Sequence, residues 1–135
     1  MLVGLFTVPP PPEFKTQEIM MRALIIEPQI FTSFMIEDAL RDAGFTSIVM
    51  ATTEEEAVAC AEADPPDLVT AAVELERGSG IRAVERIRAK LRVPVLFITQ
   101  HIGRVRAGDP KAPVVKKPFA AAHLPPAIAA AQAIG

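Results

Sequence analysis

The stretch that decides the fold reads Pro66-Asp67-Leu68-Val69-Thr70-Ala71-Ala72-Val73-Glu74-Leu75-Glu76-Arg77-Gly78-Ser79-Gly80. Its apolar run from Leu68 to Val73 is typical of a short strand buried on both faces. A polar turn follows the run and ends in Gly-Ser-Gly, and a helical pattern begins directly afterwards. In α/β proteins, functional side chains lie just past the carboxyl ends of parallel strands, so a reactive group is expected near position 72. The chain instead places two alanines, Ala71 and Ala72, at this point.

Strands and helices alternate on both sides of this stretch. Four further apolar runs predict strands at residues 23–26, 47–51, 93–99 and 114–116. Helices are expected over 30–43, 53–63, 81–90 and 120–134, whereas the glycines and prolines between 101 and 113 predict a short or irregular fourth helix. This alternation indicates an α/β protein with a flavodoxin-like, doubly wound parallel sheet of five strands in the order 2-1-3-4-5, covered by helices on both faces.

The length of 135 residues suits one folded domain, which we expect over residues 21–135. Residues 1–20 differ in composition, because a short apolar stretch is followed by the run Pro9 to Pro12, and we predict a flexible Pro-rich tail. The apolar stretch Leu2 to Val8 is too short to span a membrane and lacks the features of a signal peptide. We therefore expect a cytoplasmic protein that does not act at a membrane.

Composition argues against several classes of function. The chain has seven Phe and no Trp or Tyr, which disfavours nucleic-acid recognition by base stacking. Its single cysteine, Cys60, excludes an intramolecular disulfide and a cysteine cluster for zinc. The formal net charge is −2, and the basic residues concentrate after Arg77. We interpret them as a solvated surface, with a basic docking surface for an acidic protein as the alternative.

The first predicted helix is rich in large apolar residues. Its spacing favours Phe31, Phe34, Met35 and Ala39 as the inward-facing residues. Together with Ile36, these are more apolar side chains than one buried face of a helix needs. We favour core packing for them, and the alternative is that part of this helix forms a dimer or docking surface.

Four short segments occur in the order and near the spacing of a known family. They are the strand that ends in Glu27, the segment Pro66-Asp67-Leu68-Val69 that leads to Gly78-Ser79-Gly80, the strand over 93–99, and Lys117-Pro118-Phe119. Across residues 22–131 the chain thus resembles the receiver domain of bacterial two-component response regulators, the CheY-like fold. In that family, an acidic pair after the first strand helps to bind Mg²⁺, and an Asp at the end of the third strand accepts a phosphoryl group from a histidine kinase. A Thr or Ser and a Lys before a cis-proline then respond to the phosphate.

The resemblance implies a site that is only partly retained. Thr99 stands at the position of the switch hydroxyl, and Lys117 at the position of the lysine. Glu27 keeps one member of the acidic pair, whereas Pro28 replaces the other. Ala72 stands at the phosphoacceptor position, where the family has Asp.

Neighbouring carboxylates do not replace the missing aspartate. Asp67 begins the third strand, roughly 16 Å from position 72 at about 3.3 Å per residue, and therefore lies at the other end of the sheet. Strand alternation allows Glu74 to point the same way as residue 72, but we favour a loop carboxylate that faces water. With Ala72 and Pro28 in place, we expect no metal ligand set, no Mg²⁺ binding and no cofactor. Lys117 then either pairs with Glu27 across the crevice or projects into solvent.

We therefore expect a stand-alone pseudo-receiver without enzymatic activity. It is expected to act by protein–protein interaction in two-component or phosphorelay signalling, without phosphorylation of an aspartate. Its expected partners are a histidine kinase, a phosphotransfer protein, another regulator or a second copy of itself, and not nucleic acid. Two alternatives remain: phosphorylation at a non-standard acidic residue, Glu74, and a small-molecule sensor that uses the emptied acidic crevice.

Overall fold

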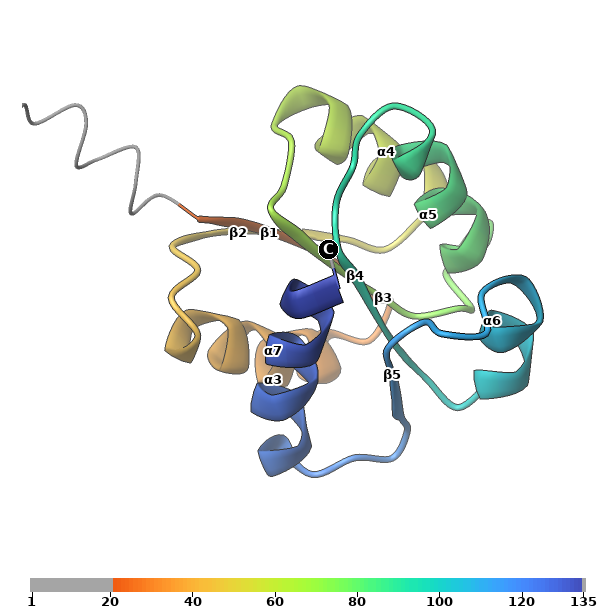
Figure 1. Ribbon diagram of the computed structural model, residues 1–135. Coiled ribbons are helices and arrows are strands. Elements are labelled where there is room, and N and C mark those ends of the chain that lie inside the picture. The colour runs from red at the N-terminus through yellow and green to blue at the C-terminus, as the bar shows by residue number, and fades with distance from the viewer. Residues whose placement is uncertain (1–20, 135) are drawn as a thin grey trace, which may run out of the picture.

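The computed structural model describes residues 21–134, and the tail predicted over residues 1–20 lies outside this range. A five-stranded parallel sheet forms the centre of the molecule, with the strand order β2-β1-β3-β4-β5 (Figure 1). The strands are β1 (Arg22–Ile26), β2 (Ser47–Ala51), β3 (Leu68–Ala71), β4 (Val95–Thr99) and β5 (Val114–Lys116). The predicted fold class and strand order are therefore confirmed.

Helices cover both faces of the sheet (Figure 1). In chain order they are α3 (Ile30–Asp42), α4 (Glu54–Ala63), α5 (Gly80–Arg88), α6 (Ile102–Gly108) and α7 (Leu124–Ile134), and a single 3-10 turn (Ala121–His123) precedes α7. One core lies between the sheet and the pair α3 and α7, and the other lies beneath α4, α5 and α6. The fourth predicted helix, α6, is a regular helix of only seven residues.

Local sequence explains where the helices begin. Thr53 accepts a hydrogen bond from the backbone N–H of Glu56, and the Glu56 carboxylate accepts one from the N–H of Thr52, which fixes the first turn of α4. Pro125 and Pro126 occupy the second and third positions of α7, where a missing backbone N–H costs no intrahelical hydrogen bond.

The predicted inward face of α3 is wrong for three residues. Phe31, Phe34 and Met35 are exposed, and the buried residues of α3 are Ser33, Ile36, Ala39 and Leu40. Both sets follow helical spacing, so periodicity alone does not distinguish them. The packing of Ile36 and Leu40 against the sheet and α7 decides the orientation and leaves the aromatic residues outside.

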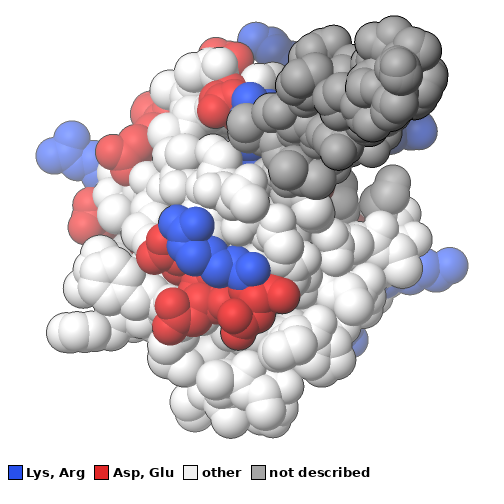
Figure 2. Space-filling view, turned by 90° about the vertical axis from the view of Figure 1, so that its left-hand side faces the viewer, with Lys and Arg blue, Asp and Glu red and all other residues white. Residues whose placement is uncertain are grey.

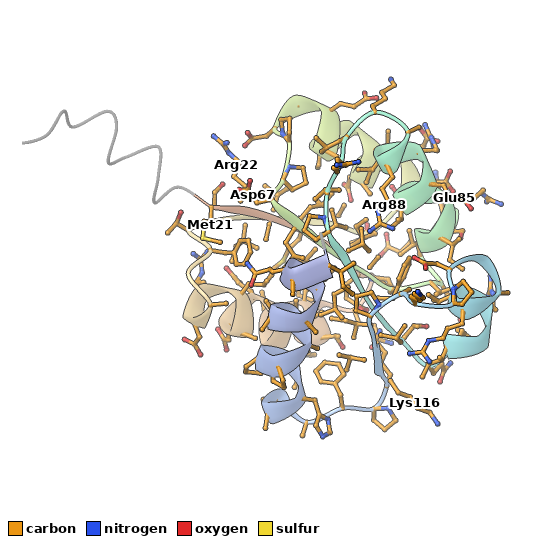
Figure 3. All side chains as sticks on the ribbon, in the orientation of Figure 1. Met21, Arg22, Asp67, Glu85, Arg88 and Lys116 are labelled. Carbon is orange, nitrogen blue, oxygen red and sulfur yellow. The ribbon has the colours of Figure 1, made fainter. Side chains whose placement is uncertain are left out.

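The two ends of the sheet differ in chemistry. At the amino end, Asp67 accepts a hydrogen bond of 2.8 Å from the backbone N–H of Arg22, and Figure 3 shows these two residues together, far from Lys116 at the end of β5. This geometry confirms that Asp67 lies far from residue 72. None of the helices between residues 21 and 134 is long and apolar enough to cross a membrane.

Candidate functional site

The carboxyl ends of β1, β3, β4 and β5 border a cleft of about 440 Å³. Its walls are made by residues from the loops after these strands and from the first turns of α3. The lining residues include all six positions that the sequence marked as a degenerate phosphorylation pocket: Glu27, Pro28, Ala72, Glu74, Thr99 and Lys117. The parallel register explains this, because it aligns the last residues of neighbouring strands.

An ion pair crosses the floor of the cleft. Glu27 directly follows β1 and is buried, and its Oε1 accepts a hydrogen bond of 2.8 Å from Nζ of Lys117. Its Oε2 accepts a second hydrogen bond of 3.1 Å from the backbone N–H of Gln29. Both carboxylate oxygens are thus engaged, as a buried charge requires. The alternative in which Lys117 projects into solvent is therefore wrong.

The position of Lys117 is set by the end of the sheet. Its backbone N–H donates to the carbonyl of Thr99 over 3.1 Å, which extends the pairing of β4 with β5 by one residue. The peptide bond between Lys117 and Pro118 is cis. Lys117 therefore starts from the strand end and reaches Glu27, although β5 and β1 are not neighbours in the sheet.

Ala72 lies one residue past the end of β3 and is held by its backbone. Its N–H donates to the carbonyl of Ile26 over 2.8 Å, and its side chain is buried. Gly80 packs directly against it: a Cβ at position 80 would lie 1.6 Å from the carbonyl oxygen of Ala72. The glycine of the Gly-Ser-Gly turn is therefore required by this close approach rather than by the turn alone.

The hydroxyl of Thr99 takes part in the loop that follows β4. Its Oγ1 accepts a hydrogen bond of 2.9 Å from the backbone N–H of His101, and the residue is buried. This bond closes the turn into α6. In this arrangement the hydroxyl orders the loop at the cleft, whether or not it also contacts a ligand.

Glu74 is an exposed loop residue, as the sequence favoured. Its carboxylate lies 3.3 Å from Nε2 of His101 and 3.8 Å from a guanidinium nitrogen of Arg104, both at the start of α6. Within the described residues, the hydrogen bonds and ion pairs of Lys117 do not include Glu74. Glu74 thus links the loop after β3 to α6 across the rim of the cleft.

Sequence reasoning missed a second cluster of charges, at the junction of α4 and α5. Glu54 accepts a hydrogen bond of 3.0 Å from the backbone N–H of Ser79 and forms ion pairs with Arg82 and Arg86. Arg86 also pairs with Glu55. The hydrogen bond from Ser79, followed by that from Arg86, lowers the pKa of the Glu54 carboxyl, although burial opposes this shift.

The cluster fixes the turn that precedes α5. Gly78 has a φ of +81°, and a Cβ there would lie 2.5 Å from the Cβ of Glu54. Ser79 caps α5, because its Oγ accepts hydrogen bonds from the backbone N–H groups of Ile81 and Arg82. The signal in the sequence was the acidic run Glu54-Glu55-Glu56, which was interpreted only as the start of the helix expected over 53–63.

Many of the later basic residues also have acidic partners. Besides Arg82, Arg86 and Arg104, Arg88 lies 3.9 Å from Asp109 and Lys90 lies 3.0 Å from Glu62. Such exposed pairs contribute little to stability, but they neutralise the charge locally. The concentration of arginines and lysines after residue 77 therefore does not form one uncompensated basic surface.

The cleft is a poor match to a magnesium site. Mg²⁺ prefers oxygen ligands, usually including one or two free carboxylates. Both oxygens of Glu27 are already hydrogen-bonded, Pro28 and Ala72 supply no side-chain oxygen, and Glu74 is paired with α6. In the part of the chain from residue 21 to 134, no group of three His, Cys, Asp or Glu side chains is arranged to hold a metal ion.

Comparison with known proteins places these observations in a family. The model of the response regulator receiver domain matches residues 23–129. The transcriptional regulatory protein PdtaR of Mycobacterium tuberculosis is 33% identical over 112 residues, which cover 79% of this chain and 54% of PdtaR. The phyllosphere-induced regulator PhyR of Methylorubrum extorquens is 34% identical over 105 residues, 75% of this chain and 39% of that protein. The matches thus span about half or less of these curated relatives.

Solved structures of response regulators also align with this chain. The receiver domain of the response regulator PhyR from Erythrobacter litoralis aligns with a TM-score of 0.76 and 34% identity, over 85% of this chain and 92% of that one. The response regulator PhyR from Brucella abortus aligns with a TM-score of 0.73 and 31% identity, over 90% of this chain and 52% of that one.

Proposed function

Because this chain belongs to the family of response regulator receiver domains, we propose that it acts in two-component signalling as a pseudo-receiver. By this term we mean a receiver fold that works by binding other proteins, without phosphorylation of an aspartate and without catalytic activity of its own. The observation that carries the proposal is the methyl side chain of Ala72 at the end of β3, where the family has its acceptor carboxylate.

The ion pair on the floor of the cleft supports the proposal. In a phosphorylated receiver, a lysine at this position responds to the negative charge of the phosphoryl group. Here the ammonium group of Lys117 already has an anionic partner in Glu27, at 2.8 Å. The cleft is therefore electrostatically satisfied without phosphate or Mg²⁺, and we propose that neither is needed for the working state.

The relatives support a regulatory role exerted through protein contacts. PdtaR is named a transcriptional regulatory protein, and a PhyR homologue from Bartonella quintana is described as an anti-anti-sigma factor. For this chain we propose a protein partner in the cytoplasm: a histidine kinase, a phosphotransfer protein or another regulator. Affinity purification of the tagged full chain after cross-linking in its native cells, followed by mass spectrometry, identifies which of these it binds.

Phosphorylation is tested directly by intact mass spectrometry after incubation of the full chain with acetyl phosphate and Mg²⁺. We expect no added phosphoryl group, while an authentic receiver with its acceptor aspartate gains one under the same conditions. The variant Ala72→Asp measures how much of the remaining machinery functions. A gain of Mg²⁺-dependent phosphorylation in this variant would mean that the loss of the carboxylate alone inactivates the site.

A phosphoryl group on the unmodified chain would contradict the proposal. Glu74→Gln then distinguishes the source, because it abolishes the signal if Glu74 is the acceptor. The position of Glu74 argues against this outcome, since its carboxylate is paired with His101 and Arg104 at the rim.

A second candidate function rests on the cleft itself. A volume of about 440 Å³ falls in the size range of small-molecule sites, and Lys117, Thr99 and Glu27 offer polar groups on its floor. A ligand sensor would show a rise in melting temperature with one metabolite of a screen, and Lys117→Met would remove that rise. Absence of any such ligand, together with capture of a protein partner, favours the pseudo-receiver.

A further inference from the structure

Helices α4 and α5 pack side by side, and a groove of about 240 Å³ lies between their carboxyl-terminal ends. Each of these helices ends where the following strand begins, α4 before β3 and α5 before β4, so the groove lies at the amino end of the sheet. The cleft lies at the opposite, carboxyl end, and the two share no lining residue. The groove is therefore a separate feature of the surface.

The walls of the groove are mainly apolar. Val58, Ala61 and Ile87 are buried members of the core beneath α4, α5 and α6, and Leu91 packs against this core while remaining partly exposed. Pro65 lines the rim and is exposed. An apolar cavity of about 150 Å³ admits a benzene ring, so the groove is large enough for a phenylalanine side chain.

The charged residues at the groove already have partners. Lys90 lies 3.0 Å from Glu62 and joins the ends of the two helices at the rim. Arg86 forms ion pairs with Glu54 and Glu55 at the start of α4. A charged occupant would have to compete with these pairs, whereas an uncharged apolar segment would leave them intact. The chemistry of the groove therefore fits an apolar segment without charge.

The described chain begins beside this groove. The N–H of Arg22 donates to the Asp67 carboxylate, and the carbonyl of Arg22 accepts from the Asp67 N–H, both over 2.8 Å. The guanidinium group of Arg22 lies 3.0 Å from Asp64. Asp64 and Asp67 flank Pro65, which lines the groove. Met21 thus lies next to the loop that forms one wall, and Figure 3 shows Met21, Arg22 and Asp67 together at this edge of the molecule.

The sequence before Met21 contains a stretch of matching chemistry. Residues 2–8 read Leu-Val-Gly-Leu-Phe-Thr-Val and carry no charged side chain. Residues 7–20 connect Phe6 to Met21, and a connection of this length can span at most roughly 50 Å. The radius of gyration of a domain of this size is about 13 Å, so the groove lies well within reach of Phe6.

We infer that the apolar segment (residues 2–8) docks in the groove between α4 and α5 of its own chain, with Phe6, its largest side chain, filling the groove. The covalent connection favours this occupant over an unlike protein, because a tether of such a length gives an effective concentration in the millimolar range. A separate protein must exceed this concentration, or bind correspondingly more tightly, to displace the segment.

The surface near the start of β1 does not oppose this arrangement. Figure 2 views the molecule from the side on which β1 begins, and acidic and basic side chains adjoin one another there within a largely uncharged visible surface. The residues that connect the segment to β1 include Glu13, Lys15 and Glu18. These charges of both signs are therefore not repelled by a visible surface of a single sign.

The variant Phe6→Trp of the full chain tests the inference, because the chain has no tryptophan of its own. The emission of the introduced tryptophan should be blue-shifted and protected from acrylamide quenching, relative to the same chain unfolded in urea. With a dissociation constant of about 1 mM or below, about half or more of the chains are docked. The emission should not change between about 1 and 100 µM protein, since docking within one chain is independent of concentration.

Two substitutions alter the groove in the background of Phe6→Trp. Pro65→Glu places a charge at the exposed rim, and Leu91→Glu places one on the partly exposed wall. Each is expected to reduce the docked population about tenfold or more and to move the emission toward that of the unfolded chain. Urea unfolding followed by circular dichroism verifies that both variants remain folded.

Phe31→Glu and Val49→Glu are the matched controls, since they place the same charge on exposed apolar residues outside the groove. Phe31 is 80% exposed on α3, and Val49 is 40% exposed on the edge strand β2. Neither should change the emission. If one of them removes the blue shift and the groove variants do not, the segment docks on α3 or along β2, and the inference is overturned.

A second measurement does not depend on the introduced tryptophan. In the unmodified chain, nuclear Overhauser effects are expected between the side chains of Leu5 or Phe6 and the methyl groups of Ile87 or Leu91. Their absence, together with emission equal to that of the unfolded chain, would overturn the inference. Emission that changes with protein concentration would do so as well, because the segment would then dock in a second copy. The phosphorylation test reports on Ala72 and is independent of this outcome.

Discussion

Lys117 donates a hydrogen bond from Nζ to Oε1 of Glu27 over 2.8 Å, although the two residues are 90 positions apart in the chain. The Glu27 side chain is 1% exposed and that of Lys117 is 24% exposed, so the pair is largely removed from water. It connects the ends of β1 and β5, which are separated in the sheet by β3 and β4. The pair is thus a structural link across the cleft as well as an electrostatic one.

Removing the positive charge of Lys117 from this ion pair should destabilise the fold. Lys117→Met leaves the buried carboxylate of Glu27 without its counter-charge, and we expect the free energy of unfolding to fall by about 2–4 kcal/mol. Urea unfolding followed by circular dichroism measures the change. The double variant Glu27→Gln with Lys117→Met should recover part of the loss, because no unpaired charge remains. Equal stability of the single and double variants would contradict the role assigned to the pair.

The stability of the fold should fall in acid through Glu54. The pKa of its carboxyl is lowered in the folded protein below its ordinary value of 4.5, first by the hydrogen bond from the Ser79 N–H and then by Arg86. The unfolded chain therefore binds the proton more readily. The stabilisation is complete above the ordinary pKa and is lost as the pH falls below it toward the folded value.

The measurement is the urea midpoint of unfolding between about pH 6 and pH 3, which spans this range. Glu54→Gln should show a smaller loss of stability over the interval than the unmodified chain. Glu85→Gln serves as the control, because Glu85 is exposed on α5 and has no ion pair within the described residues (Figure 3). Identical pH profiles for Glu54→Gln and the unmodified chain would refute the assignment.

Replacing Gly80 by alanine should be strongly destabilising. The added Cβ would lie 1.6 Å from the carbonyl oxygen of Ala72, and a backbone atom cannot move away without disturbing β3. We expect a loss of about 2 kcal/mol or more. Gly103→Ala is the comparison, since Gly103 lies in α6 with open space around it, and alanine there should raise stability by up to about 1 kcal/mol. Differential scanning calorimetry compares both variants, and a tolerated Gly80→Ala would disprove the close packing.

Two buried threonines should respond in opposite directions to the same substitution. Among residues 21–134, the side-chain hydroxyl of Thr70 is the one buried polar side-chain atom that has no hydrogen-bond partner. Thr70→Val removes this unsatisfied group at nearly constant shape and should stabilise the fold by about 1 kcal/mol. Thr99→Val removes the acceptor for the His101 N–H and should destabilise it by about 1 kcal/mol. Urea midpoints that shift in the same direction for both variants would contradict this assignment.

Much of the fold was predictable from local sequence. The apolar run after Pro66 and the alternation around it indicated the parallel sheet, and the helix expected over 53–63 corresponds to α4 with its cap at Thr53. The third strand is shorter than predicted, because its paired residues end at Ala71. Ala72 adds only the hydrogen bond from its N–H to Ile26, and Val73 is buried beyond the end of the strand. An apolar residue can be buried within a strand or beyond its end, depending on the surrounding structure. Apolar character alone does not distinguish these two positions.

The contacts that complete the site depend on long-range packing. Sequence reasoning proposed Lys117 and Glu27 as partners but left solvent exposure of Lys117 open, because the choice depends on how four strands align. The attachment of Ser79 to Glu54 was missed, since it joins a turn to a helix 25 positions earlier. The predicted inward face of α3 was wrong for a similar reason. Ser33 occupies a core position that its polarity did not suggest, and Phe31 points outward.

The neutral floor of the cleft has a consequence for the kinetics of association. The charges of Glu27 and Lys117 compensate each other at 2.8 Å, and Glu74 at the rim faces Arg104, so these four side chains together contribute little net field beyond a Debye length of about 10 Å. A partner that approaches here is not steered from a distance. Its rate of encounter should change little with ionic strength, and discrimination between partners must come from shape and from the lifetime of the complex.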